Sequence, residues 1–217
     1  IAVLERGPSG RELAAAYSNR SQLSMLACDP RPAISLGNKA IQMAKRLGDV
    51  ALESHARVNV GTMKVVAGDL SGAKDLERGL TLARRVRDDD HVTRALANTA
   101  SCLVWMRDLP RAFSVLDEAL AFTRERDLDG YHSYLLGFEA TAILLSGRLA
   151  EAADRAHALL ARPNLMLLSR ALPLTVAGRV AARRGEKAAW AHFDEALQVA
   201  DRTGELQRIA PVRAARA

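Results

Sequence analysis

The sequence is poor in aromatic residues and cysteine, and it lacks hydrophobic runs of membrane-spanning length. Phe, Trp and Tyr together make up 4% of the 217 residues. The two cysteines, Cys28 and Cys102, lie far apart and form no metal-binding or redox spacing. No apolar run approaches the roughly 20 residues of a transmembrane helix, and no signal peptide is recognisable. We therefore expect a cytoplasmic protein without contact to a membrane.

Sequence motifs of common catalytic and cofactor sites are also missing. Neither a Gly-x4-Gly-Lys-Ser/Thr phosphate loop nor a Gly-x-Ser-x-Gly nucleophile pattern occurs. The histidines do not share one face of a predicted helix at metal-ligand spacing; they are His55, His91, His132, His157 and His192. We therefore predict a protein that is not an enzyme and that holds no metal or cofactor.

The most abundant residue types favour helices. Ala, Leu and Arg dominate the sequence and are strong helix formers, and no stretch alternates apolar and polar residues long enough to indicate a strand. The 31 basic and 25 acidic side chains give a net charge of +6. Because both signs are interspersed, the charge is typical of a solvated helical surface rather than of a nucleic-acid-binding stripe. We predict an all-α fold.

A helix–turn–helix pattern recurs along the chain. Its turns are centred at Asp29, Asp69, Asp108, Arg148 and Glu186, so successive turns are 38 to 40 residues apart. A fixed period of this length indicates a solenoid, in which neighbouring units bury each other's apolar faces. We predict one domain over residues 1–217 with helix pairs at about 11–47, 50–88, 90–127, 129–162 and 165–203. Residues 205–217 would begin a further, truncated repeat, so we expect a fragment of a larger protein.

Small residues and prolines indicate where the two helices of each pair approach closely and where they turn. The residue eight positions before each turn residue is small (Ser21, Gly61, Ala100, Ala140 or Gly178), which lets two antiparallel helices approach closely. Gly68, Gly147 and Gly185 precede turn residues and offer a left-handed backbone at no steric cost. Prolines at 30, 32 and 110 indicate turns, and we expect the helices that follow them to start at Ala33 and at about Arg111. Pro173 leaves two possible starts for its helix, near Leu172 or at Leu165 with a kink.

These positions resemble the tetratricopeptide repeat (TPR). Gly61, Gly68-Asp69 and Ala73, and likewise Gly178 and Gly185-Glu186, match its small-residue and turn positions, and the resemblance covers about residues 11–203. It departs in the unit length, near 39 rather than about 34 residues, and in the loss of most consensus aromatics. The resemblance implies a right-handed α-solenoid of about five pairs. It is nearest to long-repeat TPR regions of bacterial LuxR-type or ATPase transcriptional regulators, which would bind ATP and DNA only through modules outside these residues.

The resemblance further implies that the first helix of each pair lines a concave groove. The position ten residues before each turn residue then faces the groove, and holds Asn19, Asn59, Asn98, Phe138 and Val176. An Asn amide both donates and accepts hydrogen bonds, so three in register could hold the main chain of an extended peptide. The alternative is that they satisfy neighbouring helix surfaces. Further groove candidates are Ser18, Gln22, His55, Thr62, Arg94, Ser101, Trp105, Tyr134, Thr141, Arg179 and Arg183.

Among these candidates, Trp105 is the best single anchor, because a rigid aromatic contributes much contact energy; a core position is its alternative role. The arginines could pair with a carboxylate through two hydrogen bonds. Three functions remain open. The first is a sensor or interaction region that binds a protein or peptide. The second is a spacer or dimerisation arm, which would form a homodimer and bind no ligand. The third is helical-repeat RNA binding, against which the mild charge argues.

Overall fold

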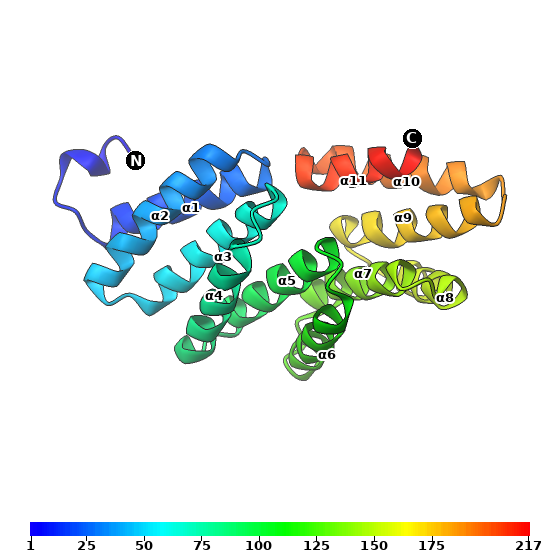
Figure 1. The fold of residues 1–217 in the computed structure, drawn as a ribbon, viewed down its shortest axis with the longest axis horizontal. Coiled ribbons are helices and arrows are strands. Elements are labelled where there is room, and N and C mark those ends of the chain that lie inside the picture. The colour runs from blue at the N-terminus through cyan, green and yellow to red at the C-terminus, as the bar shows by residue number, and fades with distance from the viewer. The chain divides into compact units, whose positions relative to one another are not determined.

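The computed structural model describes all 217 residues and contains only helices. A short 3-10 turn, η1 (Leu4–Arg6), precedes eleven α-helices (Figure 1). Their bounds are α1 (Arg11–Leu26), α2 (Pro30–Leu47), α3 (Val50–Val66), α4 (Gly72–Val86), α5 (Asp89–Trp105), α6 (Leu109–Glu125), α7 (Asp129–Leu145), α8 (Leu149–Leu160), α9 (Leu167–Arg183), α10 (Ala188–Thr203) and α11 (Leu206–Arg216). The predicted all-α class is confirmed. None of these helices combines the length and the apolar character that crossing a bilayer requires.

Contacts within the chain divide it into two compact units, Ile1–Cys102 and Leu103–Ala217. In the first unit α1 packs on α2 and α3 on α4, while α3 also contacts α1 and α2. In the second unit α7 packs on α8 and α9 on α10, and α9 also contacts α7 and α8. The first helices α1 and α7 thus each touch their own partner and the first helix of the next pair. The organisation as a single domain stays a prediction.

A single left-handed residue closes the first helix of every pair. The residue before each turn residue has a positive φ: Cys28 (54°), Gly68 (86°), Arg107 (60°), Gly147 (83°) and Gly185 (70°). The following N–H then donates to the carbonyl five residues earlier, at 2.8 to 3.2 Å, which satisfies a carbonyl that the helix end leaves unpaired. The turn positions predicted from the sequence are confirmed, although only three of the five use glycine.

Two helices begin earlier than the sequence predicted. We expected the second helix of the first pair to start after the prolines, at Ala33, and that of the third pair at about Arg111. The structure begins them at Pro30 and Leu109. Proline is accepted in a first helical turn, because the N–H that it lacks would have no helical partner there. The prolines therefore start these helices and do not delay them.

Pro173 lies inside α9 and does not start it. The helix begins at Leu167, six residues earlier. Of the two starts left open by the sequence, the longer helix is therefore nearer to the observed one. The Pro173 ring lies beside Gly137 of α7, where a Cβ would be 3.6 Å from the proline Cδ.

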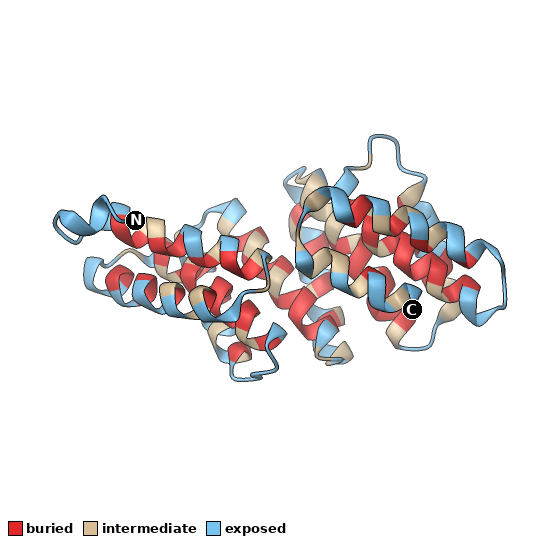
Figure 2. Ribbon diagram, turned by 90° about the horizontal axis from the view of Figure 1, so that it is seen from above, coloured by how far each residue is buried: buried red, intermediate tan, exposed pale blue.

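Apolar side chains fill the space between neighbouring helices. In the first unit Leu13, Tyr17, Ile41 and Val60 belong to one buried cluster. In the second unit Ile143, Leu144, Val176 and Val180 form another, together with four buried alanines. Figure 2 shows the buried residues on the helix faces that turn toward other helices and the exposed residues on the outer faces. Since single helices cannot bury such a face, each pair depends on its neighbours.

Helices α3 and α4 cross with glycine on both sides of the contact. A Cβ on Gly61 would lie 2.8 Å from the carbonyl oxygen of Gly72 and 2.8 Å from the backbone nitrogen of Leu76. In α9, a Cβ on Gly178 would lie 2.6 Å from the ring of Phe193. The small residues eight positions before the turn therefore set how closely the two helices of a pair approach.

Candidate protein-binding surface

Asn59 is fully buried at the centre of the first unit, between three first helices. Its Nδ2 donates to the backbone oxygen of Ser18 on α1 at 3.1 Å, and its Oδ1 accepts from a guanidinium N–H of Arg94 on α5. The amide thus joins α1, α3 and α5, and it uses both ends of its hydrogen-bonding capacity within the protein. Asn59 holds the surface together; its contact with a peptide, the role predicted from the sequence, stays a prediction.

His55 lies one turn before Asn59 and extends the same network toward α1. The Ser18 hydroxyl is 2.7 Å from His55 Nδ1, and Gln22 Oε1 is 3.1 Å from Nε2. Because the amide oxygen of Gln22 can only accept, Nε2 carries the proton and Nδ1 accepts. Burial, with help from the nearby charges of Arg94 and His91, lowers the pKa of His55 to about 3. The ring is therefore neutral at physiological pH.

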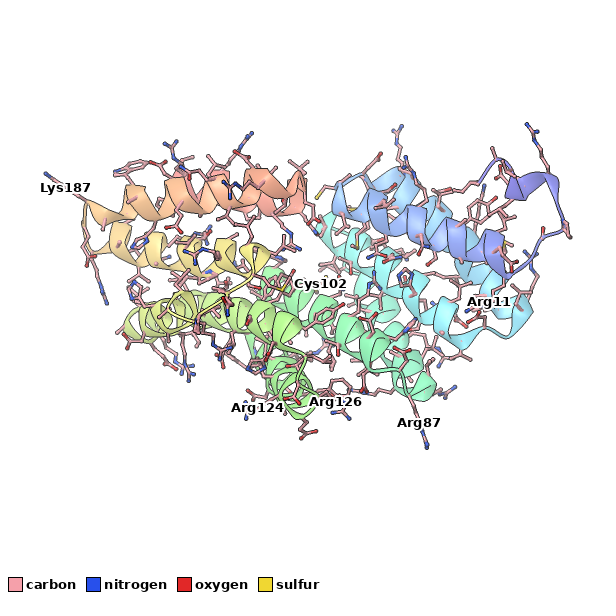
Figure 3. The ribbon with its side chains drawn as sticks, turned by 180° about the vertical axis from the view of Figure 1, so that it is seen from behind. Arg11, Arg87, Cys102, Arg124, Arg126 and Lys187 are labelled. Carbon is pink, nitrogen blue, oxygen red and sulfur yellow. The ribbon has the colours of Figure 1, made fainter.

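Asn98 continues the network on α5. Its Nδ2 donates to the backbone oxygen of Arg94 at 2.8 Å, and its Oδ1 accepts from the hydroxyl of Thr62 at 3.3 Å. The Ser101 hydroxyl donates to the backbone oxygen of Asn98 at 2.9 Å. Next to it Cys102 is buried, which raises the pKa of its thiol to about 12. Figure 3 shows Cys102 among the packed helices, whereas Arg87 and Lys187 project outward. This cysteine is a core residue.

The three asparagines therefore share a register but not an environment. Asn19 is exposed, Asn59 is fully buried, and Asn98 is half-buried. Asn59 reaches the Ser18 carbonyl of the preceding first helix. What the structure does bring together is a connected polar set on α1, α3 and α5: Ser18, Gln22, His55, Asn59, Thr62, Arg94, Asn98 and Ser101.

We call Gln22, His55, Arg94 and Asn98 the polar ridge. These four side chains are half-buried, so part of each remains accessible to solvent. Beneath them, Asn59, Ser18 and Thr62 are at least 95% buried and hold them in place through hydrogen bonds. The polar ridge is a surface with fixed donor and acceptor positions.

Predicted groove residues of the second unit form an aromatic cluster. The rings of Trp105 and Phe138 meet edge to face at 6.2 Å, and those of Tyr134 and Phe138 meet at 5.1 Å. Phe138 is buried, whereas Trp105 is 42% exposed. The guanidinium of Arg208 lies 5.3 Å from the Tyr134 ring centre. One edge of Trp105 therefore packs on the core and the rest of the ring faces solvent, and its role as an anchor for a ligand stays a prediction.

The remaining predicted positions divide between core and surface. Val176 is buried in an apolar cluster, and the buried Thr141 donates to the backbone oxygen of Gly137 within its own helix. Arg179 is half-buried, and Arg183 is exposed one turn further on. Burial and the positive charges of Arg183 and Arg107 lower the pKa of Arg179. Arg107 was not among the sequence candidates, because it lies in a turn.

Comparison with known proteins identifies the fold. No protein-family model and no curated protein matches the sequence. Among solved structures, a kinesin light chain-like protein of Podosopora anserina with nearly identical TPR-like repeats is similar. A single-substitution variant of it has 12% sequence identity and a TM-score of 0.63, with 88% of this chain and 95% of that chain covered. A second structure of that description has 11% identity and a TM-score of 0.61, with 92% and 94% covered. The chain described here has the all-α helical fold of TPR-like repeat proteins.

Proposed function

We propose that this chain is a non-catalytic scaffold that binds a protein or peptide along the first helices of its pairs. The polar ridge is the observation that carries the proposal. Its four side chains come from three successive first helices. Gln22 lies 3.1 Å from His55, Arg94 donates to Asn59, and Asn98 donates to the backbone oxygen of Arg94. A fold of TPR-like repeats, which presents helix faces side by side, is consistent with such a role.

Preorganisation is the physical reason why the polar ridge suits a binding surface. A free polar side chain loses roughly 0.5–1.5 kcal/mol of conformational freedom when a partner immobilises it. Here hydrogen bonds within the protein have already restricted Gln22, His55 and Arg94. A partner whose donors and acceptors match this pattern would therefore bind with less loss of entropy.

A peptide display library, screened against the full chain, tests the proposal. Peptides selected by the wild type are measured by fluorescence anisotropy against Gln22→Ala combined with Arg94→Ala. We expect the affinity to fall by about tenfold or more, since about 1.4 kcal/mol is lost per tenfold. A matched double variant on the exposed face of α4, Lys74→Ala with Arg78→Ala, should bind as the wild type does. Equal binding by both double variants would contradict the proposal.

The biological context that we propose is a larger bacterial signalling ATPase or LuxR-type transcriptional regulator, in which this chain is the sensor or interaction region. The sequence resemblance to long-repeat TPR regions supports it. The flanking sequence of the gene tests it: a phosphate loop upstream or a helix-turn-helix module downstream is expected. Flanking segments with neither module would contradict this context without affecting the scaffold proposal.

A spacer or dimerisation arm is the alternative outcome. Light scattering on the chain, followed by crosslinking from the polar ridge, separates the two functions. A monomer that retains its selected peptides supports the scaffold. A stable dimer whose crosslinks cover Gln22 and Arg94, and which excludes the peptides, supports the arm.

A further inference from the structure

Two histidines of the second unit lie side by side on the second helices of successive pairs. His157 belongs to α8 and His192 to α10, 35 residues later in the sequence. Their ring centres are 6.2 Å apart, and the ring planes are inclined at 45°. His157 is exposed and His192 is half-buried, so solvent reaches both rings. The pair thus lies on other helices than the polar ridge, which the first helices carry.

The rings of this pair have no polar partner within the protein, unlike those of the other three histidines. His55 lies 2.7 Å from a hydroxyl, His91 3.1 Å from a carboxylate and His132 3.0 Å from a hydroxyl. Neither His157 nor His192 makes a side-chain hydrogen bond or an ion pair. Their ring nitrogens are therefore accessible to a ligand from solution.

The spacing of the two rings fits the coordination of one metal ion by both. A metal–nitrogen bond of about 2.0–2.1 Å places the centre of an imidazole about 3.2 Å from the ion. Two imidazoles on one ion then have their centres about 5.2 Å apart at a tetrahedral angle, and about 6.4 Å apart when they lie opposite each other. The observed 6.2 Å lies between these limits. Because the outer torsion of a histidine is broad, each ring can rotate to point a nitrogen at the ion.

The donor atoms determine which class of metal the pair would take. Imidazole suits Zn²⁺, Ni²⁺ and Cu²⁺, whereas Mg²⁺ and Ca²⁺ prefer oxygen ligands. No group of three His, Cys, Asp or Glu residues in the structure could hold an ion, so water would fill the remaining positions at this pair. Such an open site binds more weakly than a structural site with four protein ligands, and its ion exchanges with the solution.

We propose that His157 and His192 together bind one transition-metal ion, Cu²⁺ more tightly than Zn²⁺, and that the ion links α8 to α10. The proposal goes beyond the scaffold function, because it concerns the second helices and involves no peptide. An ion held by both helices binds the folded unit and not the unfolded chain, so it stabilises the packing of two successive pairs. The absence of a metal was predicted from histidine spacing along single helices, and that spacing does not reveal a pair formed between helices.

Isothermal titration of the tag-free full chain with Cu²⁺, and separately with Zn²⁺, tests the proposal. In His157→Ala and in His192→Ala we expect the affinity to fall by about tenfold or more, because even the loss of a group that only orients a metal ligand costs about 10–100-fold. His91→Gln removes a histidine of the first unit and should change the affinity by less than about twofold. Both alanine variants should fold, since alanine is the strongest helix former and neither position is buried.

Electron paramagnetic resonance of the Cu²⁺ complex counts the ligands directly. The wild type should show two coordinating imidazole nitrogens, and each alanine variant at most one. Mg²⁺ and Ca²⁺ should not compete with Cu²⁺ for the site. A wild-type spectrum with a single imidazole nitrogen would mean that the histidines act independently and that no ion links the helices.

Unfolding in urea with and without Zn²⁺ shows whether the ion joins the two helices. Zn²⁺ should raise the midpoint of the tryptophan transition in the wild type, because Trp105 and Trp190 both belong to the second unit. The midpoint should not rise in His157→Ala or in His192→Ala. No binding by the wild type, equal affinity in all variants, or a midpoint shift that persists in both alanine variants would overturn the proposal.

Discussion

Arg87 closes α4 with a φ of 55°, a conformation that L-residues other than Asn and Asp rarely adopt. The same holds for Cys28 and Arg107 at the turns within pairs. At each of these positions the backbone of the repeat requires a left-handed residue, and the side chain present is tolerated at a cost.

Arg87→Gly should therefore stabilise the protein. Removing the Cβ relieves roughly 1–2 kcal/mol of steric cost, against roughly 0.5–1 kcal/mol of added chain entropy. We expect the free energy of unfolding in urea to rise by about 0.5–1 kcal/mol. Arg85→Gly, two residues earlier within α4, should lower it by up to about 1 kcal/mol. The same sign for both variants would show that the backbone at Arg87 is not strained.

His55 should make the first unit sensitive to acid. Its pKa is about 3 in the folded protein against an ordinary value of 6.5, so the unfolded chain binds more protons between these two values. This part of the stability is fully present above pH 6.5 and is lost as the pH falls toward 3, with a slope of at most about 1.4 kcal/mol per pH unit. Urea titrations from pH 7 to pH 4 measure it. His55→Gln should reduce the slope, and an unchanged slope would argue against a buried neutral ring.

At the scale of helices, much could be predicted from the sequence, because Gly-Asp turns and apolar periodicity are local signals. The number of pairs and the turn positions could be predicted from these local signals. The left-handed backbone at Cys28 and Arg107 could not be predicted, because neither residue type indicates that conformation. The burial of Asn59 could not be predicted either, because its partners Ser18 and Arg94 lie on other helices. A register position predicts which face a side chain shares, but its neighbours decide whether solvent reaches it.

The crossing of α3 and α4 provides a test at this scale. Gly61→Ala would place a Cβ 2.8 Å from the backbone of α4, which cannot move as a side chain can. We expect a loss of about 1–3 kcal/mol or more in the free energy of unfolding. Gly130→Ala in the first turn of α7 meets only the flexible Met166 sulfur, at 3.2 Å, and should be neutral or stabilising by up to about 1 kcal/mol. Chemical denaturation followed by circular dichroism measures both variants.

For the whole molecule, the division into two compact units makes a prediction about cooperativity. Repeat proteins are stabilised mainly by contacts between neighbours, so damage in one place need not spread. Both tryptophans, Trp105 and Trp190, belong to the second unit. Their fluorescence therefore follows that unit, whereas circular dichroism follows all helices.

In the Gly61→Ala variant, the dichroism transition should begin at lower urea than the tryptophan transition, because α3 and α4 belong to the first unit. Coincident transitions would mean that the two units unfold as one cooperative body. The Gly130→Ala variant serves as the control, since its substitution lies in the unit that the tryptophans report.

The left-handed cap that recurs at every turn has a consequence for how such a chain can change over time. The backbone at each of these turns is left-handed whatever the side chain. A segment of one period can therefore be duplicated or deleted between equivalent turns without changing the packing of its neighbours. Recombination at these turns would lengthen or shorten the array by whole repeats. It would also exchange the surfaces that individual repeats carry.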